Sequence, residues 1–400
     1  MSNSGIYVQV PFCQTKCTYC NFHTGVVASS RFRPYVEAVC REIREHRLLL
    51  EAAGANWPGR WRGGGVARET RSEDLAVDTV YIGGGTPSLL DAAHLQNILN
   101  AIRASFAADL TEVTLEADPE TIEAGKAAAW VRAGINRVSF GLQSFSDKEL
   151  VAAGRMHRRA DIYRAVPILR EAGIRNISFD LIAGLSHQTK ASWGQSLQEL
   201  AGLAPEHVSV YLLEIDEDSR LGKELLQGGE KYSARSVPSE DDMVEFYEMA
   251  QQVLRAAGYR HYEISNWAKP GYESKHNLKY WRREPYLGFG AGAHSFSGTE
   301  RWANAHDAAA YVTAVQGGRM PVEQHETMTA ESALEEELFL GLRQLDGIDL
   351  AQIERDYGVS LAARFDPLTS AGLVERDGSI VRLAPERLTI SNEVFVELMR

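Results

Sequence analysis

The amino-acid sequence predicts an α/β fold: an open, partial (β/α)6 barrel of the TIM type, followed by a winged-helix-like helical domain. Short apolar runs bounded by turn residues alternate with helical stretches in the first half of the chain, and this rhythm fades after about residue 216. Six such units suit an open barrel better than a closed eight-fold one. The length of 400 residues has room for the barrel and a further domain.

Each predicted strand of the barrel is a short apolar run that ends in turn residues and is followed by a helix, as in a parallel sheet. The predicted strands span residues 5–10, 77–82, 112–117, 137–142, 176–182 and 207–215. The predicted helices span residues 32–51 and 91–105, or begin after Pro119, Ser146 and Thr189. Residues 54–72, rich in Gly, Arg and Trp, interrupt the rhythm and predict an exposed loop.

The last part of the chain has a different pattern. Helical stretches precede a hairpin-like run and a final helix, an order that resembles a winged helix. Three consecutive glutamates in the first of these helices, Glu335 to Glu337, argue against DNA as its partner. We therefore expect a barrel over 1–215, a connecting region over 216–325 and a helical domain over 326–400. The expected helices are 331–343, 349–357, 360–372 and 387–399, with the hairpin at 378–383.

Composition excludes several classes of function. The chain has 54 Asp and Glu against 42 Lys and Arg, a formal charge of −12, which argues against a nucleic-acid partner. No secretory signal and no apolar run long enough to span a membrane is visible, so we expect a cytoplasmic protein with reduced thiols.

Three of the four cysteines lie close together near the start of the chain, in the pattern Cys-x3-Cys-x2-Cys. Thiolates at this spacing in a loop can bind one face of a [4Fe-4S] cluster and leave one iron open for another ligand. The alternative is a zinc site with His23 as its fourth ligand. The fourth cysteine, Cys40, lies in a helical stretch and is expected to be a small buried residue. The predicted metal ligands are Cys13, Cys17 and Cys20.

Polar residues follow or end the predicted strands, where barrel enzymes place their sites. A Gly-rich turn, "GGGTP" at 83–87, follows the second strand, and glycines there allow the backbone to approach a ligand closely. Such residues are expected to face a ligand cavity and not the packed interior. The polar residues that follow or end the later strands are Glu116, Gln143, Arg155 and Asp180.

The cysteine spacing and the Gly-rich turn together resemble the radical S-adenosylmethionine superfamily. This resemblance implies that S-adenosylmethionine chelates the open iron, that the turn binds its amino group, that Arg155 holds its carboxylate, and that Asp180 and Gln143 bind its ribose. The implied binding residues are Tyr7, Gly84, Gly85, Thr86, Glu116, Gln143, Arg155 and Asp180.

Within that superfamily the chain resembles the oxygen-independent coproporphyrinogen III oxidase group. The true oxidase has a further cysteine two positions after the third, where this chain has Phe22. This difference points to the related HemW haem chaperones, whose loop has phenylalanine there. The motif "HNLKYW" at 276–281 matches the His-Asn-x-x-Tyr-Trp motif of the same group. Imidazole is a good axial ligand for haem iron, so His276 is the first candidate haem ligand and His294 the second.

The resemblance implies a haem chaperone that binds haem, a [4Fe-4S] cluster and S-adenosylmethionine and passes haem to an acceptor protein, with a homodimer as a further expectation. The alternative is a radical enzyme that acts on a porphyrinogen or on haem. A third interpretation is that the C-terminal domain is a module for binding another protein. The sequence leaves open whether S-adenosylmethionine is cleaved.

Overall fold

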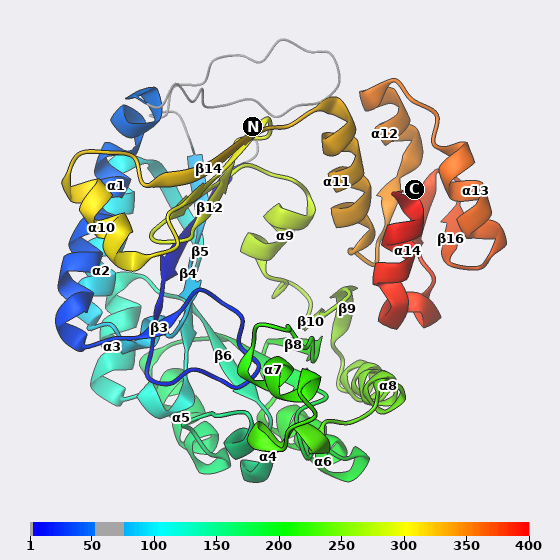
Figure 1. The fold of residues 1–400 in the computed structure, drawn as a ribbon, viewed down its shortest axis with the longest axis horizontal. Coiled ribbons are helices and arrows are strands. Elements are labelled where there is room, and N and C mark those ends of the chain that lie inside the picture. Colours follow the sequence, from blue (N-terminus) through cyan, green and yellow to red (C-terminus); the bar gives the residue numbers. More distant parts are fainter. Residues whose placement is uncertain (1–2, 53–75, 400) are drawn as a thin grey trace.

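The structure is a computed structural model that describes residues 3–52 and 76–399, so the predicted loop at 54–72 lies outside the described residues. Its centre is a parallel sheet whose strands pair in chain order and do not close into a ring (Figure 1). The predicted open barrel is therefore confirmed. Its six strands are β1 Ser4–Val10, β4 Ala76–Gly84, β5 Ala107–Ala117, β6 Arg137–Gln143, β7 Asn176–Ala183 and β8 His207–Leu212.

Helices cover the outer face of this sheet (Figure 1). At one predicted helix start the structure shows the reason. Thr189 caps α6 by accepting a hydrogen bond from the Ser192 N–H. The helix expected after Ser146 is split in two, and Arg155 lies in the break. The outer helices are α1 Phe32–Ala52, α2 Ala92–Ser105, α3 Ala124–Ala133, α4 Asp147–Ala152, α5 Arg159–Ala172 and α6 Lys190–Leu203.

The strand β6 shows how the barrel separates its core from its cavity. Val138, Phe140 and Leu142 are fully buried, in the hydrophobic core. The residues between them belong to the opposite face because side chains alternate along a strand, and they line a cavity. The inner face of this barrel is therefore polar, and it can bind a polar ligand.

The segment 216–325 contributes strands to both edges of the same sheet, which the sequence did not predict. At one edge β11 pairs with β1 in parallel, and three further strands continue antiparallel. At the other edge β10 and β9 follow β8. The strands are β9 Arg260–Glu263, β10 Asn266–Ala268, β11 Tyr286–Phe289, β12 His294–Phe296, β13 Glu300–Asn304 and β14 Val322–Thr327; the helices are α7 Arg220–Leu226, α8 Glu240–Ala256, α9 Lys275–Trp281 and α10 Ala308–Gln316.

A buried carboxylate joins helix α1 to this added edge. Glu42 accepts hydrogen bonds from the Gly290 N–H at 3.0 Å, the Asn304 amide at 2.7 Å and the Tyr311 hydroxyl at 2.5 Å. Burial raises the pKa of Glu42 to about 7, while these donors act in the opposite direction. Removing the Glu42 carboxylate would destabilise the fold, because each of the three donors would remain buried without an acceptor.

We expect Glu42→Ala to lower the free energy of unfolding by about 3 kcal/mol, since three buried donors lose their acceptor. Urea unfolding measures this change. Glu37→Ala is the matched control on the same helix, because Glu37 only pairs with Arg33 at the surface and its removal should cost less than about 0.5 kcal/mol. Equal losses in the two variants would contradict the prediction.

The C-terminal part has the predicted order of helices and hairpin, with one additional short strand in a three-stranded sheet. The acidic first helix has partners within the chain: Glu336 accepts from both Arg283 and Arg301. Its carboxylates therefore attach this domain to the barrel. Its elements are α11 Ala330–Leu342, β15 Ile348–Asp349, α12 Leu350–Tyr357, α13 Ala362–Ser370, β16 Val374–Asp377, β17 Ile380–Leu383 and α14 Ser391–Leu398.

Among the helices of the described residues, none has the length and apolar character needed to cross a lipid bilayer.

Candidate S-adenosylmethionine and cluster site

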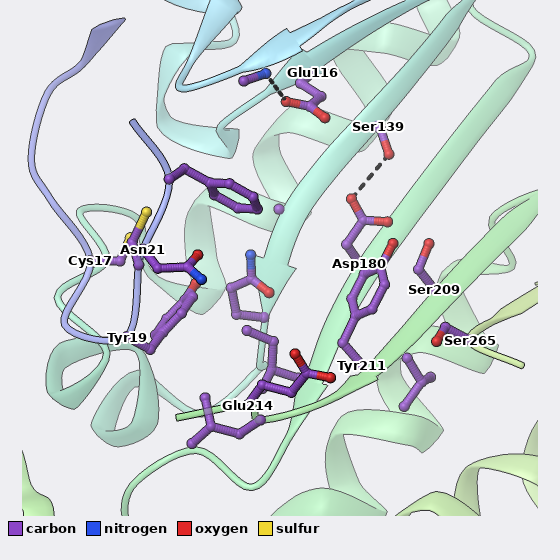
Figure 2. A pocket seen from close by; sticks show the side chains of 18 of the residues that line it. Cys17, Tyr19, Asn21, Glu116, Ser139, Asp180, Ser209, Tyr211, Glu214 and Ser265 are labelled. Carbon is purple, nitrogen blue, oxygen red and sulfur yellow. Dashed lines mark hydrogen bonds between the residues drawn. The ribbon is translucent and has the colours of Figure 1, made fainter. Parts of the chain in front are cut away.

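A cavity of about 550 Å³ lies inside the barrel and reaches the carboxyl ends of its strands. The cysteine loop lies beside it, and Asp180, Ser139 and Ser209 line the wall made by the strands (Figure 2). Ten of the residues predicted from the sequence line this one cavity. They are Cys13, Cys17, Cys20, Gly84, Gly85, Thr86, Glu116, Gln143, Arg155 and Asp180.

The cysteine loop is held in place by backbone pairing. Two short strands, β2 Phe12–Cys13 and β3 Gly25–Val26, pair in parallel and close the loop. The Thr18 N–H donates to the Ala153 carbonyl at 3.1 Å, which fixes the loop to the end of α4. All three thiols are free and partly buried, and burial raises the pKa of Cys13 and Cys20. Metal binding favours the thiolate form, so a bound cluster would oppose this effect of burial.

The Gly-rich turn packs against the cysteine loop so closely that larger residues do not fit. A Cβ on Gly85 would lie 2.5 Å from the Phe12 carbonyl oxygen and 3.0 Å from the Cys13 Sγ. Gly84 has φ of 115°, a left-handed conformation that favours glycine. The sequence therefore needs glycines here to bring the turn beside the thiols.

The turn can offer a ligand only hydrogen-bond acceptors. The Gly84 N–H donates to Glu116 Oε2 at 2.8 Å, the Gly85 N–H to the Val10 carbonyl at 2.8 Å, and the Thr86 N–H to the Phe12 carbonyl at 2.7 Å. Backbone carbonyl oxygens remain for a ligand, and they match an amino group. These carbonyl acceptors fit the amino group of S-adenosylmethionine, which donates hydrogen bonds.

Glu116 fixes this turn against the neighbouring strand. Besides the Gly84 N–H, its carboxylate accepts from the Tyr81 hydroxyl at 2.9 Å. Burial raises its pKa to about 7, and these two hydrogen bonds counteract the shift. Burial therefore favours the neutral form of this carboxyl, whereas its two hydrogen-bond donors favour the carboxylate.

Arg155 connects the cysteine loop to the cavity wall. Its guanidinium pairs with Asp118, donates to the Gly141 carbonyl at 2.8 Å, and has Nη1 at 3.4 Å from the Cys17 Sγ. A cation at this position offsets negative charge on the thiolate. The pairing with Asp118 also means that a ligand carboxylate would have to share this guanidinium.

Asp180 and Gln143 face the cavity from neighbouring strands. Asp180 accepts from the Ser139 hydroxyl at 3.0 Å (Figure 2), and burial raises its pKa. It lies within β7 and not at its end, because that strand continues to Ala183. Gln143 ends β6 with φ of 65°, and its buried Oε1 has no hydrogen-bond partner among the described residues. An unpaired acceptor beside a carboxylate fits the hydroxyls of a ribose.

Three predicted residues lie outside the lining of this cavity. The Tyr7 hydroxyl donates to the Gln9 side chain at 2.5 Å, next to the Gly-rich turn. His276 belongs to α9, which contacts the starts of the barrel strands: Lys279 bonds the Asn3 carbonyl at 2.6 Å. The predicted haem ligand thus lies at the opposite end of the barrel from the cysteine loop. His294 is exposed on β12.

His276 is also fully engaged in this structure. It is 1% exposed, its Nδ1 lies 3.0 Å from the Thr79 hydroxyl, and its Nε2 lies 2.8 Å from the Tyr280 hydroxyl. Burial, assisted by the charges of Lys279 and Arg137, lowers its pKa to about 3. The imidazole is neutral, as a metal ligand must be, but haem iron can reach it only if α9 moves.

The zinc alternative receives no support. Within the described residues, no three Cys, His, Asp or Glu side chains converge closely enough to hold one metal ion. His23 instead packs on the ring of His306, with ring centres 4.1 Å apart. A cluster requires less convergence, because its thiolates bind different irons.

Several cavity residues were not found from the sequence. They carry ordinary polar side chains, and only the alternation along the strands distinguishes inward positions from outward ones. A search for polar residues at every second position of β6 would have found two of them. The missed residues include Arg137, Ser139, Ser209, Tyr211, Ser265 and, from the C-terminal domain, Thr389 and Asn392.

The fold and this site together define a member of the radical S-adenosylmethionine superfamily. Residues 65–200 match the model of that superfamily, and residues 328–386 match the HemN C-terminal domain. The chain is also similar to a solved structure, the coproporphyrinogen III oxidase HemN from Escherichia coli, with a TM-score of 0.81 and 22% identity over 99% of this chain and 90% of that chain. The likeness to the HemN structure concerns the fold alone.

The chain belongs to the HemW family. It is 34% identical to the protein named heme chaperone HemW of Bacillus subtilis over 97% of both chains. It is 35% identical to the protein of the same name from Escherichia coli over 72% of this chain and 69% of the relative.

Proposed function

We propose that the protein is a haem chaperone that carries a [4Fe-4S] cluster and S-adenosylmethionine and transfers haem to an acceptor protein. The observation that supports this most is the convergence of three cysteines, the Gly-rich turn and the polar strand ends on one cavity. The names of its relatives supply the haem part of the proposal. A cytoplasmic location and a homodimer are further parts of the proposal.

In this proposal the three thiolates hold the cluster, and the fourth iron coordinates S-adenosylmethionine. The acceptors of the Gly-rich turn hold its amino group, and Asp180 with Gln143 holds its ribose. Arg155, whose Nη1 lies 3.4 Å from the Cys17 Sγ, would orient the carboxylate. Tyr7 supports the turn through Gln9, whose side chain a Cβ on Gly84 would touch at 2.5 Å.

The second candidate function is a radical enzyme that acts on a porphyrinogen or on haem. The cavity serves this function equally well, because reductive cleavage of S-adenosylmethionine needs the same ligands. Phe22 is the feature that disfavours the oxidase: it is 66% exposed and lines the cavity. A residue that the oxidase replaces by cysteine is here an exposed apolar side chain beside the cluster loop.

Anaerobically reconstituted protein is expected to bind about one haem per chain and to give it up to apomyoglobin, while coproporphyrinogen III with S-adenosylmethionine and dithionite remains unchanged. Absorbance follows the haem steps, and chromatography of the oxidised porphyrins follows the third. Formation of protoporphyrinogen would show that the protein is an oxidase and not a chaperone. Absence of any haem binding would rule out the chaperone function.

A further inference from the structure

A buried, unpaired arginine lies in the cavity away from the cluster loop. Arg137 begins β6, lines the cavity and is 1% exposed. Within the described part of the chain, its Nη1 forms a long hydrogen bond of 3.5 Å to the Thr114 hydroxyl, and its Nε has no partner. No carboxylate of that part forms an ion pair with it. Burying a guanidinium without an ion-pair partner destabilises the fold unless a ligand supplies the missing acceptors.

The surroundings of Arg137 do not neutralise it. His207, His276 and Tyr262 are buried close enough for its charge to act on them, and burial keeps the two histidines neutral. Asp180 is the carboxylate that senses this charge, but its oxygens accept from Ser139 and Ser178. An anion that reaches Arg137 would therefore find a cation that no carboxylate of the described residues pairs, with an unpartnered Nε–H and one long hydrogen bond from Nη1.

This position is far from the expected methionine carboxylate. Arg137 begins β6 and pairs with Asn176, the first residue of β7, whereas Gly141 pairs with Asp180 further along both strands. Gln143 is six residues further along β6, about 20 Å at 3.3 Å per residue. An amino-acid group bound beside the cysteines does not extend to Arg137, so a different ligand must supply the anion.

The cavity also has a side that reaches the C-terminal domain. Ser265, Asn277 and Arg343 line it there, and the lining continues to Thr389 and Asn392. Arg343 is already paired with Glu263, at 2.6 Å, so of these two arginines Arg137 is the one that remains for a ligand. Among the described residues, the other unpaired cation of the lining, Lys16, belongs to the cysteine loop. A cavity of about 550 Å³ holds one drug-sized ligand. A nucleoside and a whole macrocycle do not both fit, but a carboxylate arm does.

We propose that Arg137 anchors a substrate carboxylate at the end of the cavity remote from the cluster, and that this carboxylate is a propionate of the tetrapyrrole. With S-adenosylmethionine bound, only this carboxylate arm enters the cavity, and the macrocycle lies outside it, on the side that faces the C-terminal domain. The identification of the tetrapyrrole rests on the proposed function, whereas the carboxylate site rests on Arg137 alone. Arginine suits this role because its planar donors match a carboxylate in two parallel hydrogen bonds.

The carboxylate site is tested first with sodium propionate, by saturation-transfer NMR on the full chain. The wild-type protein should transfer saturation to propionate, Arg137→Gln should lose the signal, and Arg137→Lys should retain part of it. Arg170→Gln is the matched control, because Arg170 pairs with Glu206 outside the cavity. Arg137→Gln should unfold at no lower urea concentration than wild type, since the guanidinium it removes is unpaired. A propionate signal that survives in Arg137→Gln, or unfolding of that variant, would overturn the proposal.

The tetrapyrrole is tested with mesoporphyrin IX and its dimethyl ester, followed by absorbance. Charged hydrogen bonds of this kind correspond to about tenfold or more in affinity. Wild type should therefore prefer the free acid by at least about that factor, and Arg137→Gln should bind both forms alike. Binding of propionate without binding of either porphyrin would leave the carboxylate site in place and remove the haem function. An undiminished preference for the acid in Arg137→Gln would refute the anchoring role.

Discussion

Replacing Cys17 by serine is expected to lower the iron and sulfide content of anaerobically reconstituted protein by about tenfold or more, relative to a wild type that we expect to contain both. In the proposed function each of the three thiolates would bind a different iron of the cluster, and serine is a poor ligand for such soft metal sites. Cys17 also lies at 3.4 Å from Arg155, so its loss removes a contact between the loop and the cavity wall. Iron and sulfide analysis with absorbance spectra of the reconstituted variant measures the effect.

Cys40→Ser is the matched control for this experiment. Cys40 is buried in α1, among the residues of the main core, and it does not line the cavity. Its replacement costs packing but should leave iron and sulfide at the wild-type level. Full cluster content in Cys17→Ser, or equal loss in Cys40→Ser, would show that the cluster assignment is wrong.

The strands of the barrel could be predicted because each is a buried apolar run. The predicted start of 137–142 and the observed β6 agree, since both faces of that strand are enclosed. Strand β5 begins at Ala107 and not at 112 as predicted. The prediction missed its first residues, Ala107 to Thr111, because they alternate between exposed and half-buried and contain no apolar run. Strand β8 ends at Leu212 and not at 215.

The added strands at the two edges could not be predicted in the same way. Strands β10 and β12 have only three residues each, and their partners are distant in the sequence or belong to the same irregular segment. The carboxylate of Glu42 that fixes one of these edges lies in a helix more than two hundred residues earlier. Such contacts depend on tertiary structure, and local propensity contains no signal for them.

The candidate site was predictable to the extent that its residues lie in motifs. The cysteines, the Gly-rich turn and the strand-end residues were found because their spacing repeats a pattern of a known superfamily, and they do share one cavity. Arg137 belongs to no such motif, and its importance comes from the absence of a partner, which only the packing around it reveals. The position of the His276 motif at the opposite end of the barrel likewise depends on where α9 folds back.

If His276 is the haem ligand, as the sequence predicts, then His276→Ala and Tyr280→Phe should change haem affinity in opposite directions. The alanine variant loses the ligand and should bind haem at least about tenfold more weakly. The phenylalanine variant keeps the imidazole but removes the hydroxyl that occupies Nε2 at 2.8 Å. A hydrogen bond of about 1 kcal/mol then no longer opposes release of the imidazole, and affinity should rise about fivefold. Haem titrations followed by absorbance measure both changes.

The pH dependence of stability separates this role from a purely structural one. The pKa of His276 is about 3 in the folded state, below the ordinary value of 6.5. The unfolded chain therefore takes up the proton first, and this residue's contribution to stability is present above pH 6.5 and is lost as the pH falls toward 3. His276→Ala should reduce the acid sensitivity of urea unfolding between pH 6.5 and 4. His294→Ala should reduce it less, because His294 is more exposed, although burial and the charges of His306 and Arg301 also lower its pKa. If that acid effect appears but haem affinity is the same in His276→Ala, Tyr280→Phe and wild type, His276 is a structural residue. His294 then becomes the ligand to test, because it is accessible without any movement of α9.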